Sequence, residues 1–415
     1  MLTLNTLELE ALYGKDSRAL IGLPTLMKMA LSGADLTPLG TRLLQRVERY
    51  PHDANGLMDL STILQMKGDR ATALAMQAEA LKMQQLYQLP AAGEQAKIRL
   101  LALMAPGELM ANTPLEFLLE GSDVALDMLY IASHLPLPAA LPEHDLVFVA
   151  VGESDQNRPL LKHIEALIQA WARPVINAPH RIAALARDEV CTLLKSVPGI
   201  AMPMSLRIDK RALERVGREE QAIANILDDG DFPIIIRPVG SHAGRGLLKL
   251  DHPSAVNGYL GAMPENTFYV SRFVDYRGQD GLFRKYRIVL IDGRPFACHM
   301  AISAHWMIHY LNAGMSESAE KRDEEAHFMA NFDAAFARRH ATALRAITER
   351  LGLDYYGIDC AETADGKLLI FEVDTSMVVH AMDPVDLFPY KQPHMRKVFD
   401  AFRAMLAHAM RRGVP

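Results

Sequence analysis

The densest group of residues able to do chemistry lies near the C-terminal end, where Asp359, Glu372 and Asp374 flank the dipeptide Asp365-Gly366. Asp-Gly is typical of a two-residue hairpin turn, and such a turn places Asp359 opposite Glu372. Asp374 then shares the face of Glu372, because strand side chains alternate. Crowded carboxylates of this kind predict a site for a hard cation such as Mg²⁺. Three separate solvated carboxylates are the alternative, and a longer or bulged turn would change the register.

A pair of cations, Lys285 and Arg287, lies two residues apart in an apolar stretch that leads to an Asp292-Gly293 turn. On a strand both side chains project from one face. Two like charges side by side are costly unless an anion lies between them. We therefore predict that this pair binds a phosphate or carboxylate rather than forming a solvated face.

A glycine-rich loop joins an apolar strand ending at Arg237 to a second strand, and it contains Gly240, Ser241, Gly244 and Gly246. Glycines let backbone N–H groups turn toward an anion, and the guanidinium is a fixed fork for phosphate oxygens. No helix is expected after the loop, which excludes a Walker loop and a dinucleotide fingerprint. The loop predicts a hairpin that covers phosphates.

The segment Thr267–Asp275 is predicted to be a strand, and its end, Arg272, Phe273 and Val274, could hold a nucleotide base along its backbone. A plain core strand is the alternative.

Candidate substrate residues are aromatic or hydrogen-bonding side chains that follow these motifs: His305, Trp306, His309, Asn312, His380 and Asp383. The alternative for the insert around Trp306 is a group of core side chains that make their hydrogen bonds within the protein and bind no substrate. Zinc is disfavoured because no histidine pair has a cysteine or carboxylate at ligand spacing.

Helical periodicity dominates residues 23–87, and one stretch matches the large, small and turn positions of a tetratricopeptide repeat. These positions are Leu57, Leu60, Ser61, Leu64, Gly68, Ala73 and Ala80. Residues 22–53 form a poorer second copy with a turn near Gly33-Ala34. An ordinary helical hairpin is the alternative.

Residues 92–135 are expected to continue as helices, and a proline-rich stretch marks a domain boundary near Pro142. After it, residues 146–151, 159–171 and 174–177 predict a strand, a helix and a strand of a small doubly wound domain.

Composition excludes several classes of protein. The 415 residues exceed one ordinary core, and 44 basic and 50 acidic residues give a net charge of −6 without a basic run. We expect no nucleic-acid partner. The three cysteines, Cys191, Cys298 and Cys360, lack metal or pairing spacing, which indicates reduced thiols and a cytoplasmic location. No apolar run approaches about 18 residues, so neither a membrane span nor an export signal is expected.

Together these motifs, in this order, resemble the ATP-grasp superfamily, in particular its RimK-like carboxylate–amine ligases, over roughly residues 146–405. The resemblance implies ATP as cofactor, phosphate contacts from Arg237 and Lys285, and two Mg²⁺ ions, replaceable by Mn²⁺, on the three carboxylates. Arg287 would steady an acyl-phosphate. Three positions depart from the family pattern: Arg237 replaces a usual lysine, Asp374 replaces a usual asparagine, and Glu189 lies where relatives often carry lysine.

The fold expected from this resemblance is a mixed α/β chain. It comprises an all-α TPR-like domain (1–135), a doubly wound pre-ATP-grasp domain (144–205), and ATP-grasp small (206–275) and large (276–415) subdomains. The expected function is an ATP-dependent carboxylate–amine ligase, with the helical domain holding a peptide or protein substrate or forming a homodimer. Alternatives are a nucleotide-sensing TPR scaffold with a degenerate ATP-grasp domain, and a small-molecule kinase on the same fold.

Overall fold

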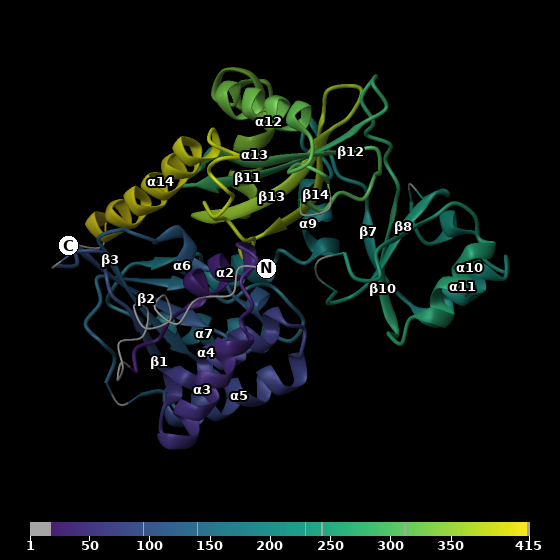
Figure 1. Ribbon diagram of the computed structural model, residues 1–415. Coiled ribbons are helices and arrows are strands. Elements are labelled where there is room, and N and C mark those ends of the chain that lie inside the picture. The colour runs from purple at the N-terminus through teal and green to yellow at the C-terminus, as the bar shows by residue number, and fades with distance from the viewer. Residues whose placement is uncertain are drawn as a thin grey trace. The chain divides into compact units, whose positions relative to one another are not determined.

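The computed structural model describes residues 18–93, 95–138, 140–228, 230–241, 244–310 and 313–412. The chain divides into two compact units. The first comprises Met1–Gly152, Gln156–Ile182 and Thr375–Pro415, and the second comprises Glu153–Asp155 and Ala183–Asp374. Figure 1 labels the elements of each unit.

The described part of the first unit begins with four helices, as the periodicity predicts. They are α2 (Leu23–Leu31), α3 (Thr37–Arg49), α4 (Ala54–Met66) and α5 (Arg70–Met83). The side chains of Asp53 and Asp69 cap α4 and α5 by accepting backbone N–H groups at 3.0 and 3.2 Å. Gly68, with φ of 85°, turns the chain between them. The helical hairpin is confirmed, and its membership of the tetratricopeptide family stays a prediction.

A five-stranded sheet completes the core of this unit, in the order β1-β3-β2-β4-β5. Its strands are β1 (Leu86–Leu89), β2 (Ile98–Met104), β3 (Val124–Tyr130), β4 (Leu146–Val149) and β5 (Val175–Ile176). Strands β2 to β5 are parallel, and β1 is antiparallel to β3.

The expectation of helices across residues 92–135 is therefore wrong. Both β2 and β3 are buried on two faces, and such strands give continuous apolar runs that periodicity does not separate from buried helix. The expected boundary near Pro142 also falls within one sheet, since Leu100 of β2 pairs with Leu146 of β4. The predicted strand–helix–strand after it is confirmed as β4, α7 (Arg158–Ile168) and β5.

The remaining helical segments near this sheet are short, except for the last. They are η1 (Leu109–Ala111), α6 (Leu115–Leu118), α8 (Pro179–Ala183) and α14 (Lys391–Arg412). Helix α14 packs on the sheet through Phe402, whose ring centroid lies 5.9 Å from that of Phe148 on β4. Arg403 also binds Asp123 at 2.9 Å. The C-terminal helix thus belongs to the first unit and not with residues 276–374, with which it was expected.

One lobe of the second unit is an antiparallel sheet in the order β7-β10-β8-β9. Its strands are β7 (Ser205–Asp209), β8 (Ile234–Pro238), β9 (Leu248–Leu250) and β10 (Thr267–Arg272). Helices α10 (Lys210–Gly217) and α11 (Ser254–Ala262), with η2 (Ile223–Asn225), share an apolar core with this sheet (Figure 1). The predicted strand–loop–strand at Arg237 is β8 and β9.

The other lobe is a sheet in the order β12-β11-β13-β14-β6. Its strands are β6 (Ile200–Ala201), β11 (Phe283–Ile291), β12 (Arg294–Ser303), β13 (Tyr355–Glu362) and β14 (Leu368–Asp374). The accompanying helices are α9 (Arg187–Leu194), α12 (Ala319–Asn331), the π-turn η4 (Asp333–Ala337) and α13 (Ala341–Leu351). The predicted turn between β11 and β12 is confirmed, with Asp292 and Gly293 at φ of 48° and 75°.

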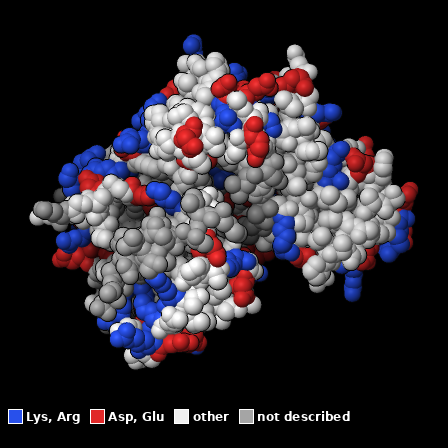
Figure 2. Space-filling view, viewed as in Figure 1, with Lys and Arg blue, Asp and Glu red and all other residues white. Residues whose placement is uncertain are grey.

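Surface charge and cysteine state agree with the composition. Figure 2 shows basic and acidic side chains interspersed on the face in view, which gives that face no field of one sign. All three cysteines are buried, and none of them forms a disulfide. Within the described ranges, no helix has the length and hydropathy needed to cross a membrane.

Candidate functional site

The hairpin of β13 and β14 sets two carboxylates against each other. Asp359 pairs with Glu372, as predicted, although the predicted two-residue turn is wrong. The turn is one residue longer, because Thr363 donates its N–H to Lys367 and Gly366 has φ of 79°. A register shift between Asp359 and Cys360 then restores the expected pairing.

Both predicted cations of β11 bind Asp359. Lys285 Nζ lies 2.9 Å from Oδ2, and Arg287 Nε lies 2.8 Å from Oδ1. The carboxylate is only 4% exposed. Burial alone would raise its pKa, but the charges of Arg287 and Lys285 outweigh burial and hold the pKa of Asp359 well below its usual range. In this structure Asp359 is the anion that the two cations share.

Glu372 is paired with a residue to which sequence reasoning gave no role. Arg187, at the start of α9, donates from Nη2 to Oε1 of Glu372 and from Nη1 to the carbonyl of Phe371 at 2.9 Å. Burial would raise the pKa of Glu372, and the charges of Arg187 and Arg237 lower it below its usual value. Arg187 precedes Glu372 by 185 residues, so no local pattern could reveal the contact.

Arg237 lies one residue before the end of β8 and binds the start of the glycine loop. Its Nε donates to Ser241 Oγ at 3.1 Å, and its Nη2 donates to the Ser241 carbonyl. Burial and the neighbouring charge of Arg187 lower the pKa of Arg237 to about 10. The charges of both arginines also act on Glu372, whose carboxylate is the anion near them in this structure.

The three loop glycines all have positive φ: 72° at Gly240, 74° at Gly244 and 66° at Gly246. A Cβ at Gly246 would also lie 2.7 Å from Pro238 Cδ, so that position excludes any side chain. The conformation of the loop therefore requires glycine at these positions, in agreement with the predicted role of glycine in the loop.

Part of the predicted substrate group lies beside this loop. A Cβ built on Gly244 would lie 3.7 Å from His309 Cδ2. Trp306 stacks edge-on against Phe273 with ring centroids 5.8 Å apart, and its carbonyl accepts a hydrogen bond from Tyr276 Oη. The insert and the end of the predicted base strand thus meet within the second unit.

The other predicted residues lie in less definite places. Arg272 and His305 are exposed, Phe273 and Val274 follow β10 directly, and Asn312 lies outside the described residues. His380 belongs to the first unit, where its ring centroid lies 6.3 Å from that of Phe117. Lys391 binds Asp383 at 3.3 Å.

The carboxylates test the predicted metal site. Oxygen donors suit Mg²⁺ in kind, yet Asp359 and Glu372 are already engaged by protein cations, and Asp374 pairs in register with Gly357. Among the described residues, no group of three His, Cys, Asp or Glu side chains is placed to hold a metal. The site as it stands is an arrangement of cations around one buried carboxylate, Asp359, and one half-buried carboxylate, Glu372. The metal assignment stays a prediction.

Comparisons with known proteins give fold-level likenesses only. No family model matches the chain, and no curated protein matches it. Among solved structures, the D-alanine–D-alanine ligase of Bacillus anthracis complexed with ATP is 13% identical, with a TM-score of 0.46, over 76% of this chain and 99% of that one. The D-Ala:D-Ser ligase of Enterococcus faecalis is 13% identical, with a TM-score of 0.46, over 75% and 100% of the two chains. A RimK-domain ATP-grasp protein of Sphaerobacter thermophilus is 18% identical, with a TM-score of 0.41, over 75% and 99%. Likeness at these scores assigns no reaction to this chain, whose chemistry has to be inferred from its own residues.

Proposed function

We propose that the second unit binds ATP and uses it to join a carboxylate to an amine. The observation that carries this proposal is the excess of positive charge beside the glycine loop. Four cations, Arg187, Arg237, Lys285 and Arg287, bind or electrostatically influence two carboxylates, the buried Asp359 and the half-buried Glu372.

An imbalance of this kind in a poorly solvated site favours an incoming polyanion. A triphosphate can accept hydrogen bonds from the arginines and the lysine, and the backbone N–H groups of the glycine loop can add to them. Transfer of those cations to phosphate would leave Asp359 and Glu372 with unpaired oxygens. We expect these carboxylates, with Asp374, to hold Mg²⁺ or Mn²⁺, which would supply neutralisation of phosphoryl charge.

The proposed reaction has two steps. A substrate carboxylate oxygen attacks the γ-phosphorus of ATP, and the bond to ADP breaks, which gives an acyl-phosphate. An amine nitrogen then attacks the acyl carbon, loses a proton, and phosphate leaves. Arg287, which is half-buried and paired with Asp359, is suited to stabilise the negative charge that develops on oxygen in both steps.

Substrate recognition is proposed for the aromatic and histidine group near the glycine loop. His309 lies beside Gly244, and Trp306 lies beside Phe273. The assignment of His305, Asn312 and His380 to substrate recognition is proposed from the sequence alone. We propose that the helices of the first unit hold a peptide or protein substrate or form a homodimer, and that the protein acts in the cytoplasm.

A second candidate, nucleotide sensing without turnover, is favoured by one specific feature. Both carboxylates are occupied by protein cations, and Asp374 stands where the resemblance expects asparagine. If nucleotide does not displace those cations, the site binds a polyanion and performs no chemistry.

The test is Mg²⁺-dependent release of ADP and phosphate by the full chain in the presence of pooled amino acids, small carboxylic acids and peptides. Glu372→Gln removes the charge that binds Arg187, and Glu349→Gln, an exposed position on α13, is the matched control. Release of both products that one pool stimulates, and that only Glu372→Gln abolishes, supports the ligase. ADP without phosphate indicates a kinase. Nucleotide binding without products supports the sensor, and no nucleotide binding would overturn both proposals.

A further inference from the structure

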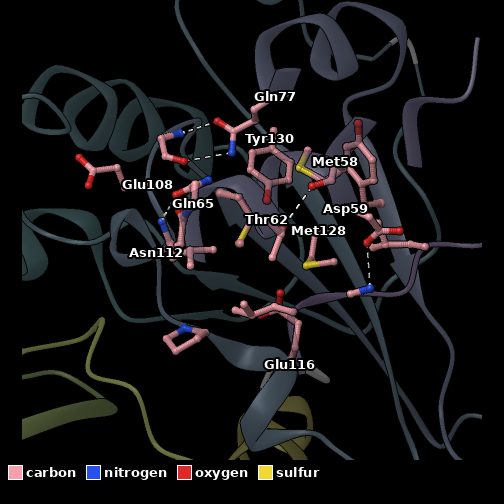
Figure 3. Close-up of a pocket in the computed structure, with 18 of the residues that line it drawn as sticks. Met58, Asp59, Thr62, Gln65, Gln77, Glu108, Asn112, Glu116, Met128 and Tyr130 are labelled. Carbon is pink, nitrogen blue, oxygen red and sulfur yellow. Dashed lines mark hydrogen bonds between the residues drawn. The ribbon is translucent and has the colours of Figure 1, made fainter. Parts of the chain in front are cut away.

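The first unit contains a cavity of about 60 Å³ that the proposed ligase chemistry does not use. It is lined by α4, α5, the segment before α2, and the carboxyl ends of β2 and β3, where Met104 and Tyr130 end their strands (Figure 3). Ligands in open parallel sheets bind outside the carboxyl ends of strands. At about 10–15 Å³ for each water-sized centre, this volume suits a molecule of about five non-hydrogen atoms.

Three side-chain amides brace the walls of the cavity. Gln77 exchanges two hydrogen bonds with the backbone of Gly107, at 3.0 and 2.7 Å. Gln65 accepts the N–H of Leu109 at 2.9 Å, and Asn112 exchanges two bonds with the backbone of Ala105. These amides are engaged in holding the loop after β2 against the helices, so the cavity is built by specific contacts.

Three other polar atoms in the lining have no hydrogen-bond partner among the described residues. They are Tyr87 Oη, Thr113 Oγ1 and Glu116 Oε2. Tyr87 and Thr113 are fully buried, at 0% exposure. Buried polar groups without partners are rare in folded proteins, because each costs the free energy of its lost hydration. A bound molecule at this position would satisfy them.

The charges around the cavity select the sign of that molecule. Asp59, Glu108 and Glu116 are in the lining, and the described lining contains no Lys, Arg or His. Figure 3 shows Glu116 on the opposite side of the cavity from Gln77 and Tyr130. Burial raises the pKa of Glu116 to about 7, because no cation is there to favour the carboxylate.

We propose that this cavity binds a small primary ammonium compound. Its ammonium group donates to Oε2 of Glu116, and the hydroxyl groups of Tyr87 and Thr113 are available to its other polar atoms. The tyrosine rings and methionines surround its carbon atoms. Above about pH 7 the ionised carboxylates of the lining repel an anion, and a neutral molecule leaves Glu116 without a counter-charge. This site is independent of ATP and of the proposed ligase reaction.

The binding test uses three probes of matched size: ethanolamine, ethylene glycol and glycolate, which are cationic, neutral and anionic. Titration calorimetry on the full chain at pH 8 is expected to show ethanolamine binding at least about tenfold more tightly than either of the others. Equal binding of the neutral probe would overturn the proposal. Binding of none of the three would mean that the cavity holds water only, and would overturn it too.

Isosteric variants locate the site. Glu116→Gln is expected to weaken ethanolamine binding about tenfold or more, and Tyr87→Phe and Thr113→Val a few-fold each. Glu120→Gln, an exposed position four residues beyond Glu116, is the matched control. The hydroxyl-free variants should melt no lower than the wild type without ligand, because they delete an unpartnered group. A lower melting temperature with unchanged binding would show that the hydroxyls have a structural role only.

Binding should also depend on pH. Because an ammonium needs the carboxylate, affinity is expected to fall about tenfold for each pH unit below about 7. The other titratable groups that line the cavity are Asp59, Glu108, Tyr87 and Tyr130, and Arg46 and Asp53 act on Asp59. Glu116→Gln should flatten most of this dependence. An affinity that does not change between pH 5 and pH 8 in the wild type contradicts the proposal.

Discussion

Buried carboxyl groups in the two units have opposite properties. Asp359, in the second unit, is 4% exposed and its pKa lies well below the usual range. Asp59, in the first unit, is 1% exposed, and burial raises its pKa to about 7 despite hydrogen bonds from the N–H groups of Ile21 and Gly22.

The difference lies in the neighbours and not in the depth of burial. Two cations contact Asp359, whereas Asp59 receives only backbone dipoles and the more distant charge of Arg46. Full positive charges offset the loss of hydration, and two amide dipoles do not. A site with preformed cations suits an anionic ligand, and a cavity with buried acids and no lining cation suits a cationic one.

The largest effect is expected when one of the ion pairs of Asp359 is removed. Arg287→Met leaves buried Asp359 with Lys285 alone, so we expect the second unit to lose about 3 kcal/mol of unfolding free energy. ADP release, if the proposed function holds, should fall at least about a hundredfold. In a Trp171→Phe background only Trp306 of the second unit fluoresces, and it can follow urea unfolding of that unit. Unchanged stability would show that the ion pairs contribute nothing net.

A second prediction concerns Asp59, the buried carboxyl group that no cation among the described residues contacts. Between pH 5 and pH 7 the folded first unit holds a proton on Asp59 that the unfolded chain has lost, so stability must fall as pH rises. Asp59→Asn removes this term. The unfolding free energy of the Asp59→Asn variant minus that of the wild type should therefore increase by about 1.4 kcal/mol for each unit of pH increase between pH 5 and pH 7. The measurement is urea unfolding in a Trp306→Phe background, where Trp171 reports on the first unit. If the unfolding free energies of the variant and the wild type changed with pH in parallel, the raised pKa of Asp59 would be contradicted.

A smaller change of the same sign is expected at Glu116. Its pKa of about 7 means that ionisation at pH 8 opposes folding, while at pH 5 the group is largely protonated. Glu116→Gln should raise the unfolding free energy of the first unit by about 2.5 kcal/mol at pH 8 relative to pH 5. The same fluorescence assay without ligand measures it, with Glu120→Gln as control. A decrease at pH 8 would mean that the carboxylate has a stabilising partner.

The smallest effect is expected where an ion pair is exposed. Arg277 binds Asp275 on the surface of the second unit, with side chains 56% and 45% exposed. Arg277→Met should leave the urea midpoint of that unit unchanged within error, because water screens exposed pairs. If Arg277→Met destabilised the unit as much as Arg287→Met, burial could not be the reason why one ion pair stabilises the protein more than the other.

Local patterns predicted the elements that carry the site in the second unit. The alternation of a strand put Lys285 and Arg287 on one face, and both bind Asp359. The pairing of Asp359 with Glu372 was also predicted, although a longer turn and a register shift compensate for each other to produce it. Strands β2 and β3 were missed, because a strand buried on both faces has no alternation to detect.

Residue order alone is enough to predict the hairpins, the glycine loop and the local spacing of the charged residues, because turns and strand alternation depend on near neighbours. The pairing of charged side chains depends instead on the folded chain. Arg187 reaches Glu372 across 185 residues, and Thr113 and Tyr87 come to line one cavity with Glu116 through separate elements. A pKa depends on burial and on charges within a few ångströms, and the fold, not the order of residues, sets both.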